Sequence, residues 1–346
     1  MPACKATDDL PNSSPVLRVP EWGHRHCSVE QALDVFAPAL PLAVACSAGA
    51  DSTALLWACA QRWPGQVCAF HVDHGLQPAA SVFAQHCAQL CTRLGVPLHL
   101  RAVDARKLPG QSPEDAARRA RYWAFASMVE QIRQQGGVVA SIALAQHAND
   151  QIETLLLALA RGAGLRGLSA MPRTWVRDGI AYHRPWLDVS RQDIRRWLAG
   201  QGVTFVEDPS NDDPSFLRNR IRQQVLPALT QCMPQCLHTF ARSSAHCAQA
   251  QQLLDDLAAM DLEQVGVPPR ITALQTLATH RQANVLRHWL ATCHGVIPSA
   301  AQLDELLRQI AHCRTRGHAV HLKVATGHCQ RQGDALHWYN IPTPTH

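Results

Sequence analysis

The sequence predicts an α/β fold, in which a doubly wound parallel sheet is followed by a mainly helical C-terminal region. Three observations support this prediction. Short apolar runs alternate with helical patterns between Leu42 and Ala160, the strand pattern fades after Ser190, and helical periodicity dominates from Phe216 to Gln309. Strands joined by helices of this length are typical of parallel sheets with helices on both faces.

The expected strands and helices of the first part alternate along the chain. Apolar runs predict buried strands, and the segments between them have the apolar spacing of helices. The third of these helices is expected to begin with Ser112 as its cap and Pro113 in its first turn. The expected strands are 42–46, 67–72, 96–103 and 138–145, and the expected helices are 52–63, 81–94, 113–134 and 149–160.

Length and composition indicate a globular chain of two or three domains. It has 346 residues, of which 47% are hydrophobic and 17% are charged, whereas one domain has roughly 150 residues. We expect a loosely ordered N-terminus over 1–25, an α/β domain over 26–228 and a mainly helical domain over 229–346. Within the last part, 319–325 and 335–341 predict a small hairpin around Gly333.

We expect a cytoplasmic protein without a membrane segment. The longest apolar stretch, 35–46, contains two prolines, and a spanning helix needs roughly 20 apolar residues. Asp8 and Asp9 lie where a secretion signal needs a basic start and an apolar run. The 13 cysteines favour free thiols, because their number is odd and no second cluster completes a zinc site.

Basic residues exceed acidic ones only slightly, with a net charge of +5. Arginine accounts for 29 of the 32 basic residues, since only three are lysine. The planar guanidinium fork suits phosphate groups. A compositional bias of the genome explains the excess of arginine equally well, so this observation alone does not identify a nucleic-acid partner.

A loop of small residues separates the first expected strand from its helix. It comprises Ser47, Ala48, Gly49, Ala50, Asp51 and Ser52. Ligands of open parallel sheets bind beyond the carboxyl ends of the strands. Small residues let backbone N–H groups approach an anion, and the helix N-terminus adds partial positive charge. Because Asp51 would repel a phosphate unless a cation bridges them, we expect Mg²⁺ at Asp51.

Three other interpretations of the glycine-containing segments fit less well. A Walker A loop needs a Gly-Lys pair, and none of the three lysines follows a glycine. A dinucleotide-binding pattern beginning at Gly162 follows an expected helix instead of a strand, so it predicts a turn. A nucleophile elbow at Ser47, with Asp150 and His183 as triad partners, lacks its first glycine and leaves Asp51 without a role.

The small-residue loop resembles the SGGxDS signature of N-type ATP pyrophosphatases, whose members cleave ATP to AMP and pyrophosphate. Further segments resemble the bacterial tRNA(Ile)-lysidine synthetases of this superfamily. These segments occur in family order across about 180 residues: 71–76, 117–122, 147–154, 161–168, 184–187, and 208–211 with 218–222. Together they are a far more specific signal than the loop alone.

The resemblance implies a PP-loop domain with the adenine-nucleotide alpha-hydrolase-like fold, and a tRNA-modifying ligase. In this family ATP adenylates the C2 oxygen of the wobble cytidine of an isoleucine tRNA with a CAU anticodon. Pyrophosphate leaves, and the ε-amine of free L-lysine then displaces AMP to form lysidine. The resemblance thus implies ATP and Mg²⁺ as cofactors and this tRNA as partner. The oligomeric state stays open, with a homodimer as one option.

Residues expected to contact ATP lie in the small-residue loop and in two further segments. His71 and Asp73 are two residues apart at a strand end, so both can point to one side of the sheet. Arg118 and Arg121 recur at helical spacing and present adjacent forks. Such forks fit either the pyrophosphate group or tRNA phosphates, and a surface salt bridge is the structural alternative.

The expected catalytic residues are Asp51, His147, Asp150, Glu153 and Arg222. Asp150 and Glu153 share one helix face just after His147. These two acids can hold the lysine ammonium or Mg²⁺, and one can take a proton from the attacking amine. A solvated helix face with a capping role is the structural alternative. Arg222 pairs with Arg218 at helical spacing.

Two departures from the family pattern keep other functions open. Ala48 replaces the usual glycine, and its methyl group would crowd pyrophosphate or require a backbone angle that alanine disfavours. Gln77 stands where an arginine is common. One alternative is a catalytically weakened RNA-binding protein. Another is a related tRNA thiolase, although such enzymes commonly use a CxxC pair and this sequence has none. Candidate RNA contacts after residue 228 are Arg281, Arg287, Arg308, Arg314 and Arg316.

Overall fold

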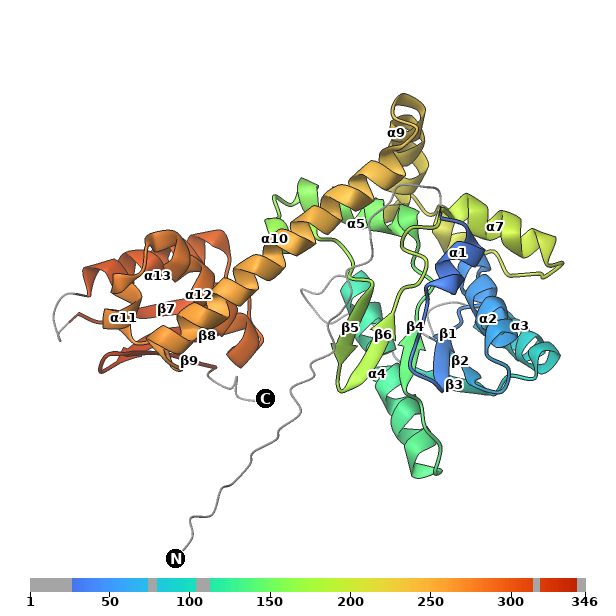
Figure 1. The fold of residues 1–346 in the computed structure, drawn as a ribbon, viewed down its shortest axis with the longest axis horizontal. Coiled ribbons are helices and arrows are strands. Elements are labelled where there is room, and N and C mark those ends of the chain that lie inside the picture. The colour runs from blue at the N-terminus through green and yellow to red at the C-terminus, as the bar shows by residue number, and fades with distance from the viewer. Residues whose placement is uncertain (1–26, 74–79, 104–112, 314–317, 341–346) are drawn as a thin grey trace, which may run out of the picture.

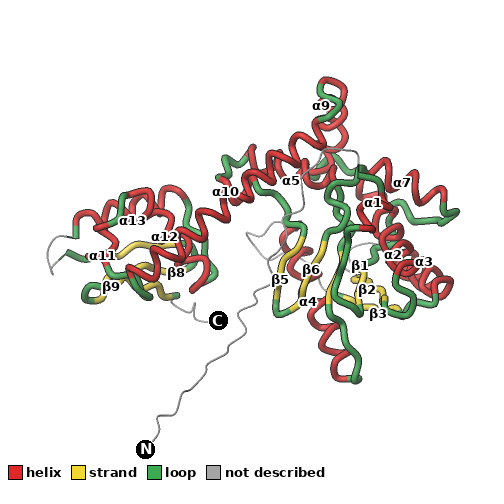
Figure 2. Tube along the Cα trace, in the orientation of Figure 1, coloured by secondary structure: helices red, strands yellow, loops and turns green. Residues whose placement is uncertain are grey.

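The computed structural model describes residues 27–73, 80–103, 113–313 and 318–340. Two bodies are joined by the long helix α10 (Cys236–Val265), as Figure 1 shows. The first body is an α/β domain, and the second combines helices with a small sheet (Figure 2). No helix within these residues is long and apolar enough to cross a membrane.

The α/β body is built on a six-stranded sheet with the order β3-β2-β1-β4-β6-β5. The neighbouring strands from β3 through β2, β1 and β4 to β6 all pair in parallel. Only the edge strand β5 is antiparallel to its neighbour, β6. The fold class that the sequence predicts is therefore confirmed. The strands are β1 (Leu42–Ala45), β2 (Val67–Asp73), β3 (Leu98–Ala102), β4 (Ser141–Ala143), β5 (Thr174–Arg177) and β6 (Ile180–His183).

The direction of strand addition reverses beside β1. The chain adds β2 and β3 on one side of β1 and then returns to place β4 on the other side, so that Leu42 pairs with both Val67 and Ser141. Such a switch point opens a crevice at the carboxyl ends of the two strands on either side of it. The segments that follow β1 and β4 therefore meet at the expected ligand position.

Helices cover both faces of this sheet. Helix α4 (Pro113–Gln134) packs on one face, where Phe125 and Met128 join Phe70 in a core. The other face carries a larger core in which Leu55 and Leu56 are completely buried. The helices on that face are α1 (Val29–Asp34), α2 (Ala50–Arg62), α3 (Ala80–Leu94) and α7 (Arg191–Gly200).

The hairpin of β5 and β6 was not anticipated from the sequence. Asp178 and Gly179 connect its strands, and both have positive φ angles, 52° and 75°. An Asp-Gly pair between β-forming residues is a strong local signal for such a two-residue turn. The four-residue strands on either side are too short to produce a clear alternating pattern.

The second body contains three strands where the sequence suggested two. The turn at Gly333 joins β8 (Gly327–Gln332) to β9 (Ala335–Tyr339), and β7 (His321–Val324) pairs with β8. A side chain at Gly327 would place its Cβ atom 2.5 Å from the Trp338 ring, so only glycine fits there. Leu336 and residues of this body's helices, α11 (Ile271–Thr276), α12 (Thr279–His294) and α13 (Ala300–His312), enclose its core.

Some expectations concern residues outside the described ranges. These are the loosely ordered segment 1–25, the Ser112 cap, Gln77, Arg314 and Arg316. The expected domain boundary after residue 228 falls inside helix α9 (Leu226–Cys232).

Candidate active site

The small-residue loop is held in shape by its two serines. Ser52 Oγ accepts a hydrogen bond from the Ser47 amide at 3.0 Å and lies 3.1 Å from Ser47 Oγ. It also donates to the Gly49 carbonyl at 3.2 Å. Gly49 is the N-cap of α2 in an extended conformation without a side-chain cap. The first amides of α2 have no partner within the helix, so they are available to an anion.

Ala48 adopts the left-handed backbone conformation that the glycine of related loops adopts easily. Its φ angle is 68°, and the residue is completely buried in the core of the α/β body. The Val206 amide donates to its carbonyl at 2.9 Å. The methyl group therefore packs into the core of the α/β body. The cost of alanine here is backbone strain of roughly 1 kcal/mol.

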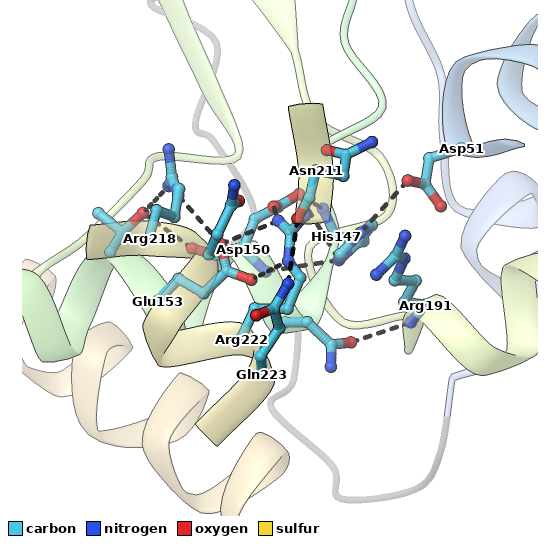
Figure 3. A network of polar contacts seen from close by, with 12 residues as sticks. Asp51, His147, Asp150, Glu153, Arg191, Asn211, Arg218, Arg222 and Gln223 are labelled. Atoms are coloured by element: carbon cyan, nitrogen blue, oxygen red, sulfur yellow. Dashed lines mark hydrogen bonds and ion pairs between the residues drawn. The ribbon is translucent and has the colours of Figure 1, made fainter. Parts of the chain in front are cut away.

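Asp51 and His147 meet at the switch point between β1 and β4 (Figure 3). His147 Nε2 lies 3.5 Å from Asp51 Oδ2. Burial favours the neutral form of Asp51, but His147, Arg191 and Arg195 outweigh it and hold the pKa of this carboxyl below its ordinary value. Asp51 Oδ1 is buried without a hydrogen-bond partner among the described residues.

His147 begins helix α5 (Ala148–Ala160) as its N-cap. The Asp150 amide donates to His147 Nδ1 at 3.4 Å, and Asp150 Oδ2 accepts from the His147 amide at 3.1 Å. Burial disfavours the imidazolium, but the carboxylates of Asp150 and Asp51 prevail and raise the pKa of His147. The buried ring thus joins two acids that come from different strand ends.

Glu153 is completely buried and is bound by two arginines. Arg222 Nε donates to Glu153 Oε1 at 2.7 Å, and Arg218 Nε donates to Oε2 at 3.0 Å. Arg222 Nη2 also reaches Asp150 Oδ1 at 3.3 Å. Burial opposes the charge of Arg222, yet Glu153, Asp150 and Asp51 raise the pKa of its guanidinium. Glu153 therefore holds both arginines and fixes Arg222 beside Asp150.

The arginines come from a distorted helical segment. The mainly helical region expected from Phe216 onward begins with α8 (Leu217–Arg220), which passes into a π-helical turn, 221–225, before α9. Pro227 lacks the amide that would continue the regular ladder, and the Leu226 amide donates to Ile221 instead. Single π-turns of this kind occur frequently at functional sites. This one presents Arg222 to the carboxylates of α5.

Four further residues of the expected ATP site differ in their burial and in their contacts. His71 is buried, with Nδ1 2.8 Å from the Cys46 carbonyl oxygen. Asp73 ends β2. Arg118 is exposed and lies over the Tyr122 ring, 5.8 Å from its centroid. Arg121 has no hydrogen bond or ion pair within the described ranges, and burial lowers the pKa of its guanidinium.

The hydrolase alternative finds no support in the geometry. Asp150 contacts His147 and Arg222, whereas His183 Nδ1 lies 3.5 Å from Thr174 Oγ1, so no contact among the described residues joins the two expected triad partners. The glycine-containing segment at 162–167 follows α5 and opens the short helix α6 (Leu165–Leu168), in agreement with the expected turn.

Sequence reasoning missed two contributors to the site. Arg191 and Arg195 lie in α7 and add positive charge near Asp51. The Asn149 side chain accepts a hydrogen bond from the Arg191 amide at 3.0 Å, which ties the start of α7 to α5. Ser190 as a cap signals that a helix starts here, but no local pattern indicates its distance from Asp51.

Comparison with known families agrees with this geometry. Residues 26–229 match the family model described as a PP-loop domain, and residues 270–337 match the model described as the TilS substrate binding domain. The fold and the site therefore define a PP-loop protein, a class that uses ATP.

Proteins named tRNA(Ile)-lysidine synthase are similar to this chain over most of its length. The protein of Polaromonas naphthalenivorans is 56% identical, with 86% of this chain and 89% of that protein covered. The Bordetella bronchiseptica protein is 42% identical over 82% and 84%. For Pseudomonas fluorescens the identity is 41%, and the chain spans only 57% of that relative. The chain belongs to the tRNA(Ile)-lysidine synthase family.

Proposed function

We propose that this protein is a ligase that joins lysine to the wobble cytidine of tRNA(Ile) with a CAU anticodon, at the expense of ATP. One observation carries the proposal. Asp51 of the small-residue loop and Asp150 of α5 both contact the His147 ring, at 3.5 Å each, beyond the carboxyl ends of β1 and β4. An ATP-binding loop and a second acidic group are thus joined in one site. Family membership supports this assignment.

The first half of the reaction uses the small-residue loop. The triphosphate lies against the free amides at the start of α2, where the partial charge of the helix favours anions. The C2 oxygen of cytidine attacks the α-phosphorus, and the bond to pyrophosphate breaks. Arg121 and Arg118 provide positive charge for the departing pyrophosphate, since Arg121 has no protein partner within the described ranges.

Asp51 is the residue that fits Mg²⁺. Its Oδ1 atom is buried without a partner among the described residues, and its pKa is lowered, so it presents an ionised oxygen. Mg²⁺ is commonly held by one or two carboxylates together with substrate phosphates and water. This agrees with the lack of a cluster of three His, Cys, Asp or Glu side chains in the part of the chain that is described. When bound, the ion neutralises charge on the phosphates.

The second half of the reaction uses Asp150. Its side chain is 16% exposed, whereas that of Glu153 is completely buried between Arg218 and Arg222. Asp150 holds the lysine ε-ammonium and accepts its proton. The amine nitrogen then attacks C2, the C2–O bond breaks, and AMP leaves with that oxygen. Glu153 acts as a positioning residue, because it orients Arg222, which contacts Asp150.

The tRNA contacts involve the second body as well as the crevice. Two candidate arginines there are already engaged, since Arg281 pairs with Asp261 and Arg308 pairs with Glu305. Arg287 is exposed on α12. The charged groups available for phosphates are therefore fewer than the sequence suggests.

Incorporation of radiolabelled lysine into an unmodified tRNA(Ile) transcript with a CAU anticodon tests the proposal. We expect incorporation that requires ATP and ceases when the wobble cytidine is replaced by uridine. Binding of the transcript without any incorporation would contradict the ligase assignment and favour an RNA-binding protein that has lost activity.

A further inference from the structure

We propose that the outer face of the small sheet in the second body binds unpaired nucleotides of the tRNA substrate. This inference rests on the proposed function and identifies where the second body contacts the RNA. The outer face is defined by six side chains on β7, β8 and β9: His321, Lys323, His328, Gln330, His337 and Tyr339.

Strand register places these six residues on one side of the sheet. His321 pairs with Gln330 and Lys323 pairs with His328, while Tyr339 pairs with His328 from the other edge. Side chains alternate between faces along a strand. The alternate residues, such as Val324, face the other way and are buried in the core with α12 and α13. The outer face is therefore the side of the sheet that does not pack on these helices.

Three rings form a cluster on the outer face. The rings of His321 and His328 are 5.2 Å apart between centroids and inclined by 10°. Those of His328 and Tyr339 are 5.8 Å apart and inclined by 24°. Tyr339 Oη lies 3.2 Å from His321 Nε2, so the cluster joins all three strands of the sheet. A planar base can stack on the exposed ring of His321 at one side of this cluster.

The charge of the outer face favours a nucleic acid over an acidic or apolar protein segment. None of the six residues carries a carboxylate, and Lys323 is an exposed cation beside the rings. Stacking on rings with a nearby cation is how many sheet surfaces bind single-stranded RNA. The family model for a substrate binding domain covers 270–337, which includes most of this sheet.

Equilibrium binding of a fluorescent tRNA(Ile) transcript to the full chain tests this inference. We expect Tyr339→Ala to weaken binding roughly ten-fold. Tyr339→Phe, which keeps the ring and loses only the hydroxyl contact with His321, should change binding by less than about two-fold. Lys323→Ala should weaken binding a few-fold and reduce the dependence on salt. Arg308→Ala is the matched control, since it removes an exposed cation of the same body that is already paired with Glu305.

Several outcomes would overturn the inference. Wild-type affinity in both Tyr339→Ala and Lys323→Ala would do so, as would equal losses in Lys323→Ala and Arg308→Ala. If Tyr339→Ala does not fold, His321→Ala takes its place, because His321 is the exposed ring of the cluster. A dimer that dissociates in the variants while RNA affinity stays unchanged would assign the face to a second copy. Failure of the wild-type chain to incorporate lysine would instead contradict the proposed function.

Discussion

His147 Nε2 lies 3.5 Å from Asp51 Oδ2, and this contact joins the loop after β1 to the helix that follows β4. The two residues are 96 positions apart in the chain and meet because the strand order reverses beside β1. The ring also contacts Asp150, so one imidazole joins an acid of the small-residue loop to an acid of α5. The order of the strands in the sheet therefore brings the two parts of the site together.

Replacement of Asp51 by asparagine should abolish the adenylation of the tRNA without disturbing the fold. The variant keeps the shape of the side chain but removes the charge that balances a cation on the phosphates. We expect tRNA-dependent release of pyrophosphate to fall by about 100-fold or more, with an unchanged melting profile. Asp34→Asn is the control, because this exposed carboxylate pairs only with Arg62 in the described contacts. Near-normal activity of Asp51→Asn would remove Asp51 from the proposed metal site.

Replacement of Asp150 by asparagine should impair the use of lysine more than the use of ATP. The neutral amide neither balances the ammonium nor accepts its proton. We expect the KM for lysine to rise roughly ten-fold while the KM for ATP changes less than about two-fold. Lysine titrations at saturating ATP measure the effect, with the exposed Asp304→Asn as control. An equal rise in both constants would contradict the assignment of Asp150 to the lysine half.

Glu153→Gln should destabilise the fold instead of changing a single substrate constant. The buried carboxylate compensates the charges of Arg218 and Arg222, and its removal leaves Arg218 with the exposed Glu114 and Arg222 with Asp150 as their remaining ion-pair partners among the described residues. We expect a loss of about 3 kcal/mol in the free energy of unfolding, as for other broken buried pairs. The exposed pair of Glu130 with Arg133 offers a matched control, because Glu130→Gln should leave the free energy of unfolding almost unchanged. Similar losses in the two variants would contradict the structural role of Glu153.

Ala48→Gly should leave the affinity for ATP almost unchanged. The methyl group is buried in the core, so its removal opens no space beside the phosphates. Relief of strain at φ 68° and loss of packing have opposite effects, and we expect the free energy of unfolding to change by less than about 1 kcal/mol. Ala48→Val should cost about 2 kcal/mol or more, since a branched side chain disfavours this backbone angle and overfills the core. A several-fold gain in ATP affinity for Ala48→Gly would show that the methyl group obstructs the nucleotide.

The sequence predicted features whose signal is local. The loop around Asp51 follows a short buried strand, and the helix spacing of His147, Asp150 and Glu153 places them near one another. Both patterns depend on neighbours within a few residues, so single-sequence reasoning could find them.

The sequence could not predict features that depend on distant packing. Glu153 was expected to handle a substrate or a metal, but in the structure it binds arginines that lie 65 and 69 residues further along the chain. The π-turn that presents Arg222 depends on Pro227 within a helical pattern that otherwise looks regular. Likewise, the sequence indicates the strained angle of Ala48 but does not indicate that its methyl group points into the core.

Transfer of label from ATP to tRNA in the absence of lysine tests the proposed chemistry most directly. ATP labelled at the α-phosphate is mixed with the wild-type protein and the CAU transcript, and the reaction is quenched before a second turnover. We predict a labelled tRNA that appears together with pyrophosphate and loses its label as AMP when lysine is added. Formation of ADP, or release of AMP with no label on the tRNA before lysine is added, would contradict adenylation of the cytidine at the crevice of Asp51 and His147.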